Sequence, residues 1–342
     1  MATVDSDAHV VETEHTWDYL EPSERKWRPT GVQVEGPDGP REYWLIDGKL
    51  FNRRTNIGRD TTEATREMAD IHARLKHMDE LEVDVHVLYP TLFLRPISDK
   101  PEVELAIYRS YNRWLADIWK QGGGRLRWAA MAPVATMDSV ADELRWCKEH
   151  GAVAVFLRGL EHDHLLSDPY MFPLYDEAER LDLAIGVHSG NGAFDVHDYF
   201  GDEGGFCKFK LAVVGSFHAV VMQDVPSRFP KLRFAFVEVS AQWVPYALHD
   251  LAIRVRKKGR EFDMKRVLRD NRIWVACQTD DDLDYVLEYT GDDNVVIGSD
   301  YGHADTSSEL EALRHLRGEG KVAPAVIDKI LDANARMLYG LN

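Results

Sequence analysis

Short runs of apolar and β-branched residues recur along this chain, and polar or small residues follow the end of each run. Their length and their content of Val, Ile and Phe predict β-strands. The runs begin near Ala2, Val83, Leu126, Ala152, Leu183, Leu232, Arg272 and Asn294. Because most of the runs are nearly continuous in apolar residues, without strict alternation, we predict strands that are buried on both faces, as in a parallel sheet.

Segments with a helical period separate the predicted strands. In residues 61–81, apolar residues recur every three or four positions and predict one amphipathic helix. Further helices are predicted in residues 137–150, 308–316 and 326–339. Eight strands that alternate with helices most simply form a closed (β/α)8 barrel, the TIM barrel. An open, doubly wound sheet is the alternative, but no glycine-rich phosphate-binding motif follows the first strand, where DSDAHVVE stands.

We predict that residues 1–342 form one barrel domain, because barrels commonly use this much chain as a single domain. Two segments are too long for plain connections. Residues 13–60, rich in Trp, Pro and Arg, are a predicted lid insertion after the first strand, and residues 191–205 are a second long loop. Such loops usually bind ligands or cover active sites. Both follow a strand, so we expect both on the C-terminal face, where active sites of barrels form.

Composition and charge narrow the classes of partner. The chain carries 41 Lys and Arg against 58 Asp and Glu, a formal net charge of −17. So acidic a surface repels nucleic-acid backbones and anionic membranes, and neither is an expected partner. Three distant cysteines without CxxC spacing argue against a disulfide framework or a thiolate zinc site. Without a signal peptide or a membrane-spanning apolar run, we expect a soluble cytoplasmic protein.

Four side chains that can bind a metal ion stand at the ends of predicted strands. Asp7 and His9 are two positions apart on the first strand, so both point to the same face. His188 ends the fifth strand and Asp300 ends the eighth. In a closed barrel these strand ends converge near the axis, and carboxylates and imidazoles suit a borderline or hard divalent ion. A polar pair beside a turn or a helix cap explains each motif alone, but the shared position at C-terminal strand ends favours a metal-dependent enzyme.

The same segments resemble a known family. DSDAHVVE, PLYDEAERLDLAIGVHSG, SRFPKLRFAFVEVSAQWVP and VVIGSDYGHAD, in this order over almost the whole chain, resemble the amidohydrolase-related superfamily. The branch that looks most similar holds the aminocarboxymuconate-semialdehyde and resorcylate decarboxylases. The resemblance implies a distorted barrel with one Zn²⁺ or Mn²⁺ ion on Asp7, His9, His188 and Asp300. It also implies a homodimer or a larger homo-oligomer.

The chain departs from the family pattern at two positions. Many members have His-x-His on the first strand, where this chain has Asp7, and many end the sixth strand with His, where this chain has Glu238. A carboxylate at the first position makes the site harder, so Mn²⁺ competes with Zn²⁺ as the expected ion. No lysine ends the fourth strand, so we do not expect the dinuclear site with a carbamylated lysine that other members have.

Several residues are candidates for the group that transfers a proton during the reaction. In hydrolytic members Asp300 would accept a proton from water, and in decarboxylating members an acid protonates the ring carbon. Burial beside other carboxylates would raise the pKa of Glu238, although pairing with an arginine of the lid is an equal alternative. His218 lies on a predicted amphipathic helix and can pack against the core, but the resemblance favours a place close to the site. His303 follows Asp300 and is expected to reach the site more readily.

Three arginines and a tyrosine are candidates for binding the substrate. Arg158 ends the fourth strand and would direct its guanidinium at an anionic substrate, as would Arg53 or Arg54 from the lid. Ion pairing within an acidic protein is the alternative for all three. Tyr89 closes the second strand and would line a pocket for an aromatic ring.

These observations predict a metal-dependent, non-oxidative decarboxylase, a carboxy-lyase that acts on an aromatic or unsaturated small-molecule carboxylic acid. The alternative is a hydrolase that cleaves an amide, ester or carbon–carbon bond with metal-bound hydroxide, and Glu238 in place of the family's His keeps it open. A barrel that only binds a metal is disfavoured by the complete set of ligands.

Overall fold

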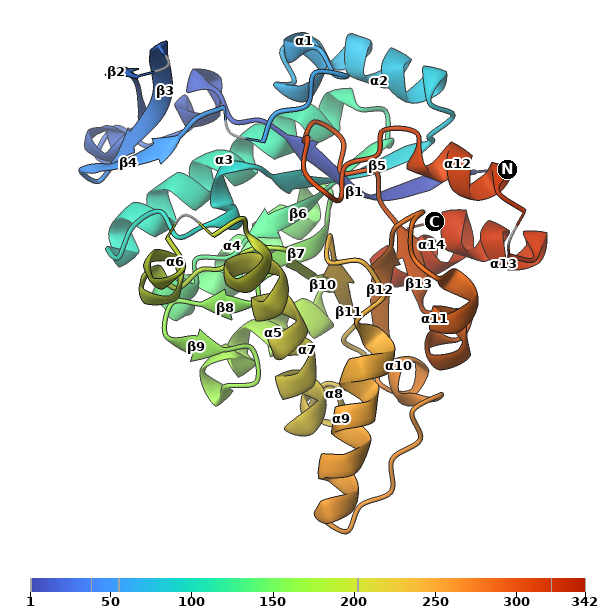
Figure 1. Cartoon of the computed structure of the whole chain (residues 1–342). Helices are drawn as coiled ribbons and strands as arrows, with labels where there is room; N and C mark the ends of the chain where they lie inside the picture. The colour runs from blue at the N-terminus through green and yellow to red at the C-terminus, as the bar shows by residue number, and fades with distance from the viewer. Residues whose placement is uncertain (1, 38, 55, 202, 321, 342) are drawn as a thin grey trace.

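Eight parallel strands form the central sheet of the computed structural model, which describes residues 2–37, 39–54, 56–201, 203–320 and 322–341 (Figure 1). In spatial order the strands are β1 (Val4–Val10), β5 (Val85–Pro90), β6 (Leu126–Met131), β7 (Ala152–Arg158), β10 (Ala184–His188), β11 (Phe234–Val237), β12 (Ile273–Cys277) and β13 (Val295–Ile297). Nearly every residue in them is buried, as their continuous apolar runs predict.

The sheet closes on itself through the segment that follows β13. The backbone N–H of His9 donates to the carbonyl of Tyr301, and that of Asp300 donates to the carbonyl of Asp7, each at 2.9 Å. The buried Asp5 carboxylate reinforces this seam, because it accepts from the N–H groups of Asp7 at 3.1 Å and Ser299 at 3.0 Å. The predicted (β/α)8 architecture is therefore confirmed, as a nearly closed barrel.

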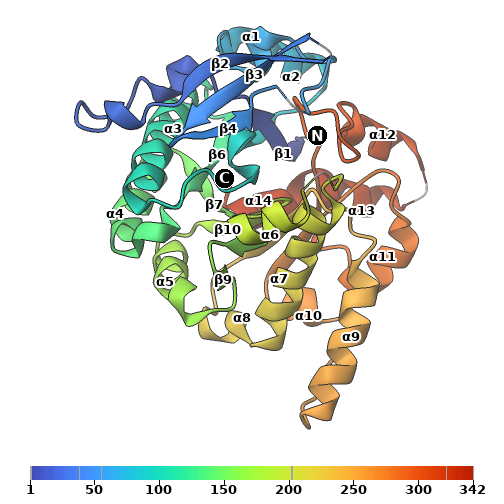
Figure 2. The same ribbon diagram turned by 60° about the vertical axis from the view of Figure 1, so that its left-hand side comes forward.

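Helices surround the strands, as Figure 2 shows from a second direction. The longer ones are α2 (Ile71–Glu80), α3 (Pro101–Gln121), α4 (Val140–Glu149), α5 (Phe172–Arg180), α7 (Leu211–Met222), α9 (Val244–Lys257) and α11 (Leu283–Thr290). The shorter ones are α1 (Glu63–Arg66), α6 (Phe194–Tyr199), α8 (Val225–Arg228), α10 (Val267–Asp270), α12 (Ala312–Gly318), α13 (Pro324–Asp328) and α14 (Asn334–Tyr339). Within the described part of the chain, no helix is both long enough and apolar enough to cross a membrane.

The prediction of one helix in residues 61–81 is wrong, because the structure divides it into α1 and α2. Met68 adopts a left-handed backbone conformation, with φ of 55°, which no helix continues through. The Asp70 carboxylate then accepts from the N–H of Ala73 at 3.0 Å and starts α2 as a new N-cap. Met68 still packs into the core, so the apolar periodicity is retained across the break.

The last two predicted helices also differ from the structure. Instead of starting at residue 308, α12 starts at Ala312, because the Ser308 hydroxyl donates to the Asp300 carboxylate at 2.5 Å. The helix predicted in residues 326–339 starts earlier, at Pro324, and a π-helical turn (Lys329–Ala333) joins α13 to α14.

The predicted lid insertion, residues 13–60, forms secondary structure of its own beside the barrel. It contains an antiparallel sheet of β2 (Thr30–Gly36), β3 (Gly39–Ile46) and β4 (Lys49–Asn52), which Figure 1 places next to α3. The buried rings of Trp17 and Trp44 meet edge to face with centroids 5.8 Å apart and attach this sheet to the core. Residues 38 and 55 of the predicted lid lie outside the described residues. A short hairpin, β8 (Leu160–Glu161) with β9 (His164–Leu165), follows β7.

Candidate metal centre

Buried acidic and imidazole side chains gather at the carboxyl ends of four strands. They come from the end of β1, from the last residue of β10, and from the segments that follow β11 and β13. The group consists of Asp7, His9, His188, Glu238, Asp300 and His303. None of these residues is more than 6% exposed, so their charges are held away from water.

The metal-binding atoms of this group lie within contact distance of one another. The Asp7 Oδ1 atom is 3.4 Å from His9 Nε2 and 3.1 Å from His188 Nε2. Glu238 Oε2 is also 3.1 Å from His188 Nε2, and Asp300 Oδ1 is 3.3 Å from His9 Nε2. Two sets of potential ligand atoms each lie within 4.8 Å of one another. One set comes from Asp7, His9, His188 and Glu238, and the other from His9, Asp300 and His303. Glu238 therefore lies near both imidazoles, and Asp300 lies near that of His9.

The two imidazoles are oriented for metal binding by their other nitrogen. His9 Nδ1 lies 2.9 Å from the carbonyl of Pro90, and His188 Nδ1 lies 3.1 Å from that of Ser189. A carbonyl only accepts, so each Nδ1 carries the proton and each Nε2 turns a lone pair toward the acidic group. Burial lowers the pKa of His9 to about 3, which keeps its ring neutral.

Several buried atoms at the centre of this group have no hydrogen-bond partner. Among the described residues, they include His9 Nε2, Glu238 Oε2 and Asp300 Oδ1. Buried polar atoms are normally paired, and lone pairs that converge without a donor repel one another. A divalent cation would accept lone pairs of this kind, so the residues present fit a metal ion that prefers nitrogen and oxygen ligands.

Backbone strain directs two of the carboxylates into the site. Glu238 has a φ of 61° and Asp300 a φ of 51°, both in the left-handed region. This conformation is uncommon for Asp and more so for Glu, and it costs about 1–3 kcal/mol where it occurs.

Burial, followed by repulsion from Asp300, raises the pKa of Glu238 well above its ordinary range. Both effects favour the protonated form of the Glu238 carboxyl.

His303 forms a second pair with Asp300 above the ring of His9. His303 Nδ1 is 2.8 Å from Asp300 Oδ1, its Nε2 is 2.9 Å from the Thr91 hydroxyl, and its ring stacks on that of His9 with centroids 3.8 Å apart. Burial alone would lower the pKa of His303, but the Asp300 carboxylate outweighs it and the pKa is raised. This pair can exchange a proton with a bound molecule.

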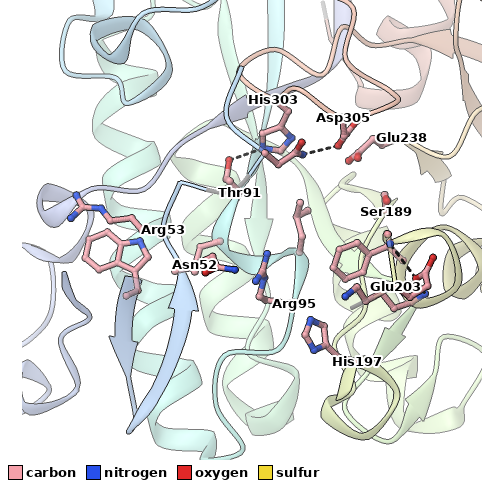
Figure 3. Close-up of a pocket in the computed structure, with 18 of the residues that line it drawn as sticks. Asn52, Arg53, Thr91, Arg95, Ser189, His197, Glu203, Glu238, His303 and Asp305 are labelled. Carbon is pink, nitrogen blue, oxygen red and sulfur yellow. Dashed lines mark hydrogen bonds between the residues drawn. The ribbon is translucent and has the colours of Figure 1, made fainter. Parts of the chain in front are cut away.

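A cavity of about 480 Å³ opens onto this group, a volume typical of small-molecule sites (Figure 3). Glu238, His303 and Asp305 line its side next to the strand ends. The predicted lid and the loop of residues 191–205 both contribute lining residues, among them Trp44 and His197. The backbone N–H of Gly58 donates to the carbonyl of Gly302 at 2.9 Å, so the end of the lid is attached to the loop that carries Asp300.

Two candidates from the sequence lie away from the cavity. His218, on α7, has its Nε2 2.9 Å from Asp250 Oδ2 of α9, so its ring joins two outer helices. Arg158 is buried and forms an ion pair with Glu161. Its remaining donors reach the carbonyls of Phe93 at 3.2 Å and Arg95 at 3.1 Å. Of the two interpretations that the sequence left open for Arg158, the structure shows the ion pair within the protein.

The other candidates have mixed positions. Arg53 lines the cavity, but both of its terminal nitrogens are 2.6 Å from the Glu14 carboxylate, and its guanidinium lies over the Trp44 ring. Arg54 pairs with Glu42 and Glu63 at the surface and does not line the cavity. Tyr89 is buried behind the metal-binding group, with its ring centroid 5.0 Å from that of His188 and its hydroxyl 3.1 Å from that of Tyr339.

The sequence analysis missed several residues of the cavity, among them Glu12 and Arg95. The Glu12 carboxylate accepts from the backbone N–H groups of Thr91 at 3.1 Å and Leu92 at 3.0 Å, and so holds the turn after β5. Arg95 follows in the same turn and lines the cavity. The sequence did offer a signal for Arg95, because this cationic residue follows shortly after the predicted strand that stops at Pro90, in YPTLFLRP.

Comparisons with known proteins agree with this architecture. The sequence model of the amidohydrolase family matches residues 4–341. A curated relative, the 2-amino-3-carboxymuconate-6-semialdehyde decarboxylase of Dictyostelium discoideum, is 25% identical over 145 residues, which are 42% of this chain and 38% of that relative. The matched region is thus well under half of that relative's length.

Solved structures resemble the whole chain. An amidohydrolase from Mycobacterium avium subsp. paratuberculosis superposes with a TM-score of 0.80 at 18% identity, covering 100% of this chain and 98% of the other. The 5-carboxyvanillate decarboxylase of Sphingomonas paucimobilis gives 0.72 at 17%, covering 100% and 99%. A dihydroxybenzoic acid decarboxylase from Polaromonas sp., with bound manganese and 2-nitroresorcinol, gives 0.67 at 16%, covering 100% and 97%. At these identities the likeness establishes the fold.

Proposed function

The chain belongs to the amidohydrolase family, a family of metal-dependent enzymes, and on this premise we propose that it is a non-oxidative decarboxylase of an aromatic or unsaturated carboxylic acid. One observation carries the proposal: the carboxyl of Glu238, whose pKa is raised by burial and by Asp300, faces a cavity of about 480 Å³ beside a group of metal-binding side chains. The decarboxylase names of the curated relative and of two similar structures support it.

We assign the metal ion to Asp7, His9, His188 and Asp300, with Zn²⁺ as the expected ion and Mn²⁺ as the alternative. The bound ion would supply Lewis acidity toward the substrate carboxylate or a neighbouring oxygen. Two carboxylates against two imidazoles make the site harder than one of imidazoles alone, which keeps Mn²⁺ in competition. Carbonyls behind the two rings fix their orientation, so the site exists before the ion binds.

Glu238 is the proposed proton donor. Decarboxylation of a ring requires a proton on the carbon that bears the carboxylate, and the electrons of the breaking carbon–carbon bond return to the ring as CO₂ leaves. In this proposal Glu238 carries that proton on its carboxyl group, which lines the cavity, and burial together with Asp300 favours the protonated form by raising its pKa. His303 lines the same side of the cavity and is the alternative donor.

A hydrolase remains the second candidate, and the pair of Asp300 and His303 favours it. The 2.8 Å contact between Asp300 Oδ1 and His303 Nδ1 is an arrangement in which Asp300 can accept a proton from an attacking water and pass it on. The substrate would then be an amide, an ester or an activated carbon–carbon bond.

The test is CO₂ release from a panel of hydroxybenzoates and muconate-type acids by protein loaded with Zn²⁺ or Mn²⁺. Glu238→Gln should lower kcat by about 10²–10⁴-fold, the usual contribution of a general acid. Glu288→Gln, on the exposed side of α11, is the matched control and should retain the wild-type rate. Full metal occupancy with no CO₂ from any acid contradicts the proposal, and turnover of amides or esters under those conditions favours the hydrolase.

Some expectations from the sequence stay predictions. They are the homo-oligomeric state, the cytoplasmic location and the organisation of residues 1–342 as one domain. Light scattering coupled to size-exclusion chromatography measures the first directly, and a monomer at micromolar concentration would contradict it.

A further inference from the structure

Arg95 differs from the other arginines near the cavity, because its guanidinium has no partner. Among the residues that the structure describes, no hydrogen bond or ion pair involves its side chain. Arg53, by contrast, pairs with Glu14, and Arg158 pairs with Glu161. Burial lowers the pKa of Arg95, and no neighbouring carboxylate offsets it. The chain has 58 Asp and Glu residues. It is therefore unusual that no carboxylate among the described residues pairs with this half-buried guanidinium.

The cavity has an acidic side and a basic side. Glu238, Asp305 and His303 lie together at one side in Figure 3, next to the metal-binding group. Arg95 and His197 lie away from them, toward the opposite side of the cavity. A molecule that spans the cavity therefore meets Glu238 and His303 of the metal-binding group at one end and a free guanidinium at the other.

Glu203 also lines this part of the cavity, but its carboxylate accepts from the backbone N–H groups of Gly205 and Phe206, which leaves Arg95 as the anion-binding group there. Burial, more than the adjacent Arg95, lowers the pKa of His197, so its ring is neutral at neutral pH and can act as a hydrogen-bonding partner. The Lys208 amine donates to the carbonyl of Gly201 at 2.7 Å. Arg95 thus offers a planar, fully charged group suited to a carboxylate.

The backbone around Arg95 is held in place from two neighbouring strands. Arg158, at the end of β7, donates to the Arg95 carbonyl at 3.1 Å. Beyond β10, the N–H of Asn191 donates to the Leu94 carbonyl at 2.9 Å. A Cβ at Gly190 would lie 2.8 Å from that same carbonyl, so the two segments approach closely only because Gly stands there. The guanidinium is therefore presented from a fixed backbone, which lowers the entropic cost of binding.

We propose that Arg95 binds a second carboxylate of the substrate, so that the enzyme acts on a dicarboxylic acid. One carboxylate lies at the metal-binding group, where the reaction occurs, and the other is held by Arg95 at the far side of the cavity. This inference rests on the proposed function and narrows its substrate class. Arg95 takes no part in the bond-breaking step, and its role is to select and orient the substrate.

Matched ligands test the proposal by binding, without requiring turnover. Salicylate carries one carboxylate, while 4-hydroxyisophthalate and 2-hydroxyterephthalate add a second at different ring positions. Isothermal titration of the metal-loaded protein should show at least one dicarboxylate binding about 10- to 100-fold more tightly than salicylate. Arg95→Gln should remove that preference and leave the Kd of salicylate unchanged, while Arg95→Lys should retain part of it.

Arg127→Gln is the control, because Arg127 lies near the start of β6, at the other end of the barrel, and does not line the cavity. It should keep the wild-type preference. Metal content and circular dichroism of each variant separate loss of binding from loss of fold. The proposal is overturned if neither dicarboxylate binds more tightly than salicylate, or if Arg95→Gln keeps the preference.

Failure of this inference and failure of the proposed function give different results. A preference for dicarboxylates that Arg95→Gln abolishes, without CO₂ release from any acid, supports the anchor and contradicts the decarboxylase. CO₂ release at similar rates from mono- and dicarboxylic acids, with no preference in binding, supports the decarboxylase and contradicts the anchor.

Discussion

We predict that the buried pair of Arg158 and Glu161 stabilises the barrel and does not bind the substrate, and this can be measured. The pair is almost fully excluded from water, and the backbone N–H of Arg158 also donates to Glu161 Oε1 at 2.7 Å. Two further donors reach carbonyls in the turn after β5. A Cβ at Gly192 would lie 2.9 Å from Arg158 Cζ, so the guanidinium is enclosed on that side as well.

The magnitude follows from the charge that each substitution leaves behind. Glu161→Gln leaves the guanidinium buried without its counter-charge, which costs about 3–5 kcal/mol. For a chain of 342 residues the unfolding entropy is roughly 0.7 kcal/mol/K, so Tm should fall by about 4–7 °C. Arg158→Met should cost a similar amount, because it isolates Glu161 and leaves two carbonyls without donors. The double variant removes both charges, and we expect a coupling energy of at least about 2 kcal/mol.

Urea unfolding of the wild type, both single variants and the double variant measures this coupling directly. All four should keep their bound metal, because neither residue belongs to the metal-binding group. Additive losses of stability would refute the assignment of a buried pair. Unchanged stability together with a large rise in KM for Arg158→Met would show instead that Arg158 is the substrate anchor that its place at a strand end suggested.

Two further predictions concern the metal-binding group and a titrating loop. In Gly298→Ala the new Cβ would lie 2.1 Å from Asp7 Cβ, so β1 must shift. Metal affinity, measured by competition with a chelator, should then fall by roughly 10-fold or more. The control is Gly215→Ala on α7, which has open space around it and should bind metal normally. His162 Nε2 contacts Glu104 at 2.7 Å, and although burial lowers its pKa, Glu104 raises it above the ordinary 6.5. The stability from this contact should be fully present below about pH 6.5 and be lost as the pH rises through the raised pKa. The stability difference between wild type and His162→Asn should therefore shrink from pH 6 to pH 9 in urea unfolding, and a constant difference would refute this.

The barrel could be predicted from the sequence because its strands are buried on both faces and read as apolar runs. The first of these runs carries Asp7, the fifth ends at His188 and the eighth leads to Asp300, and parallel strands bring their carboxyl ends to one face. Positions of metal-binding candidates are therefore a consequence of topology, which hydrophobic periodicity reveals. The break between α1 and α2 escaped prediction because Met68 is apolar and in phase with the helix, while its backbone is left-handed.

The roles of the arginines could not be predicted, because they depend on pairings that the pattern of the chain does not show. Arg158 stands at a strand end like the metal-binding residues, but Glu161, three residues later, turns back and neutralises it. Arg95 lies in a turn without a regular period and is distinguished only by the absence of a partner within the described residues. His218 has the spacing of a helix face, and its partner Asp250 comes from a helix 32 positions further along.

Metal content tests the central claim most directly. Elemental analysis of wild type, His188→Ala and His218→Gln, each incubated with Zn²⁺ and Mn²⁺ and then dialysed, compares a histidine of the metal-binding group with one that joins two outer helices. We predict about one equivalent of Zn or Mn in the wild type and in His218→Gln, and its loss in His188→Ala. A wild-type protein that stays empty with both ions, or a His188→Ala variant that keeps a full equivalent, would contradict the account.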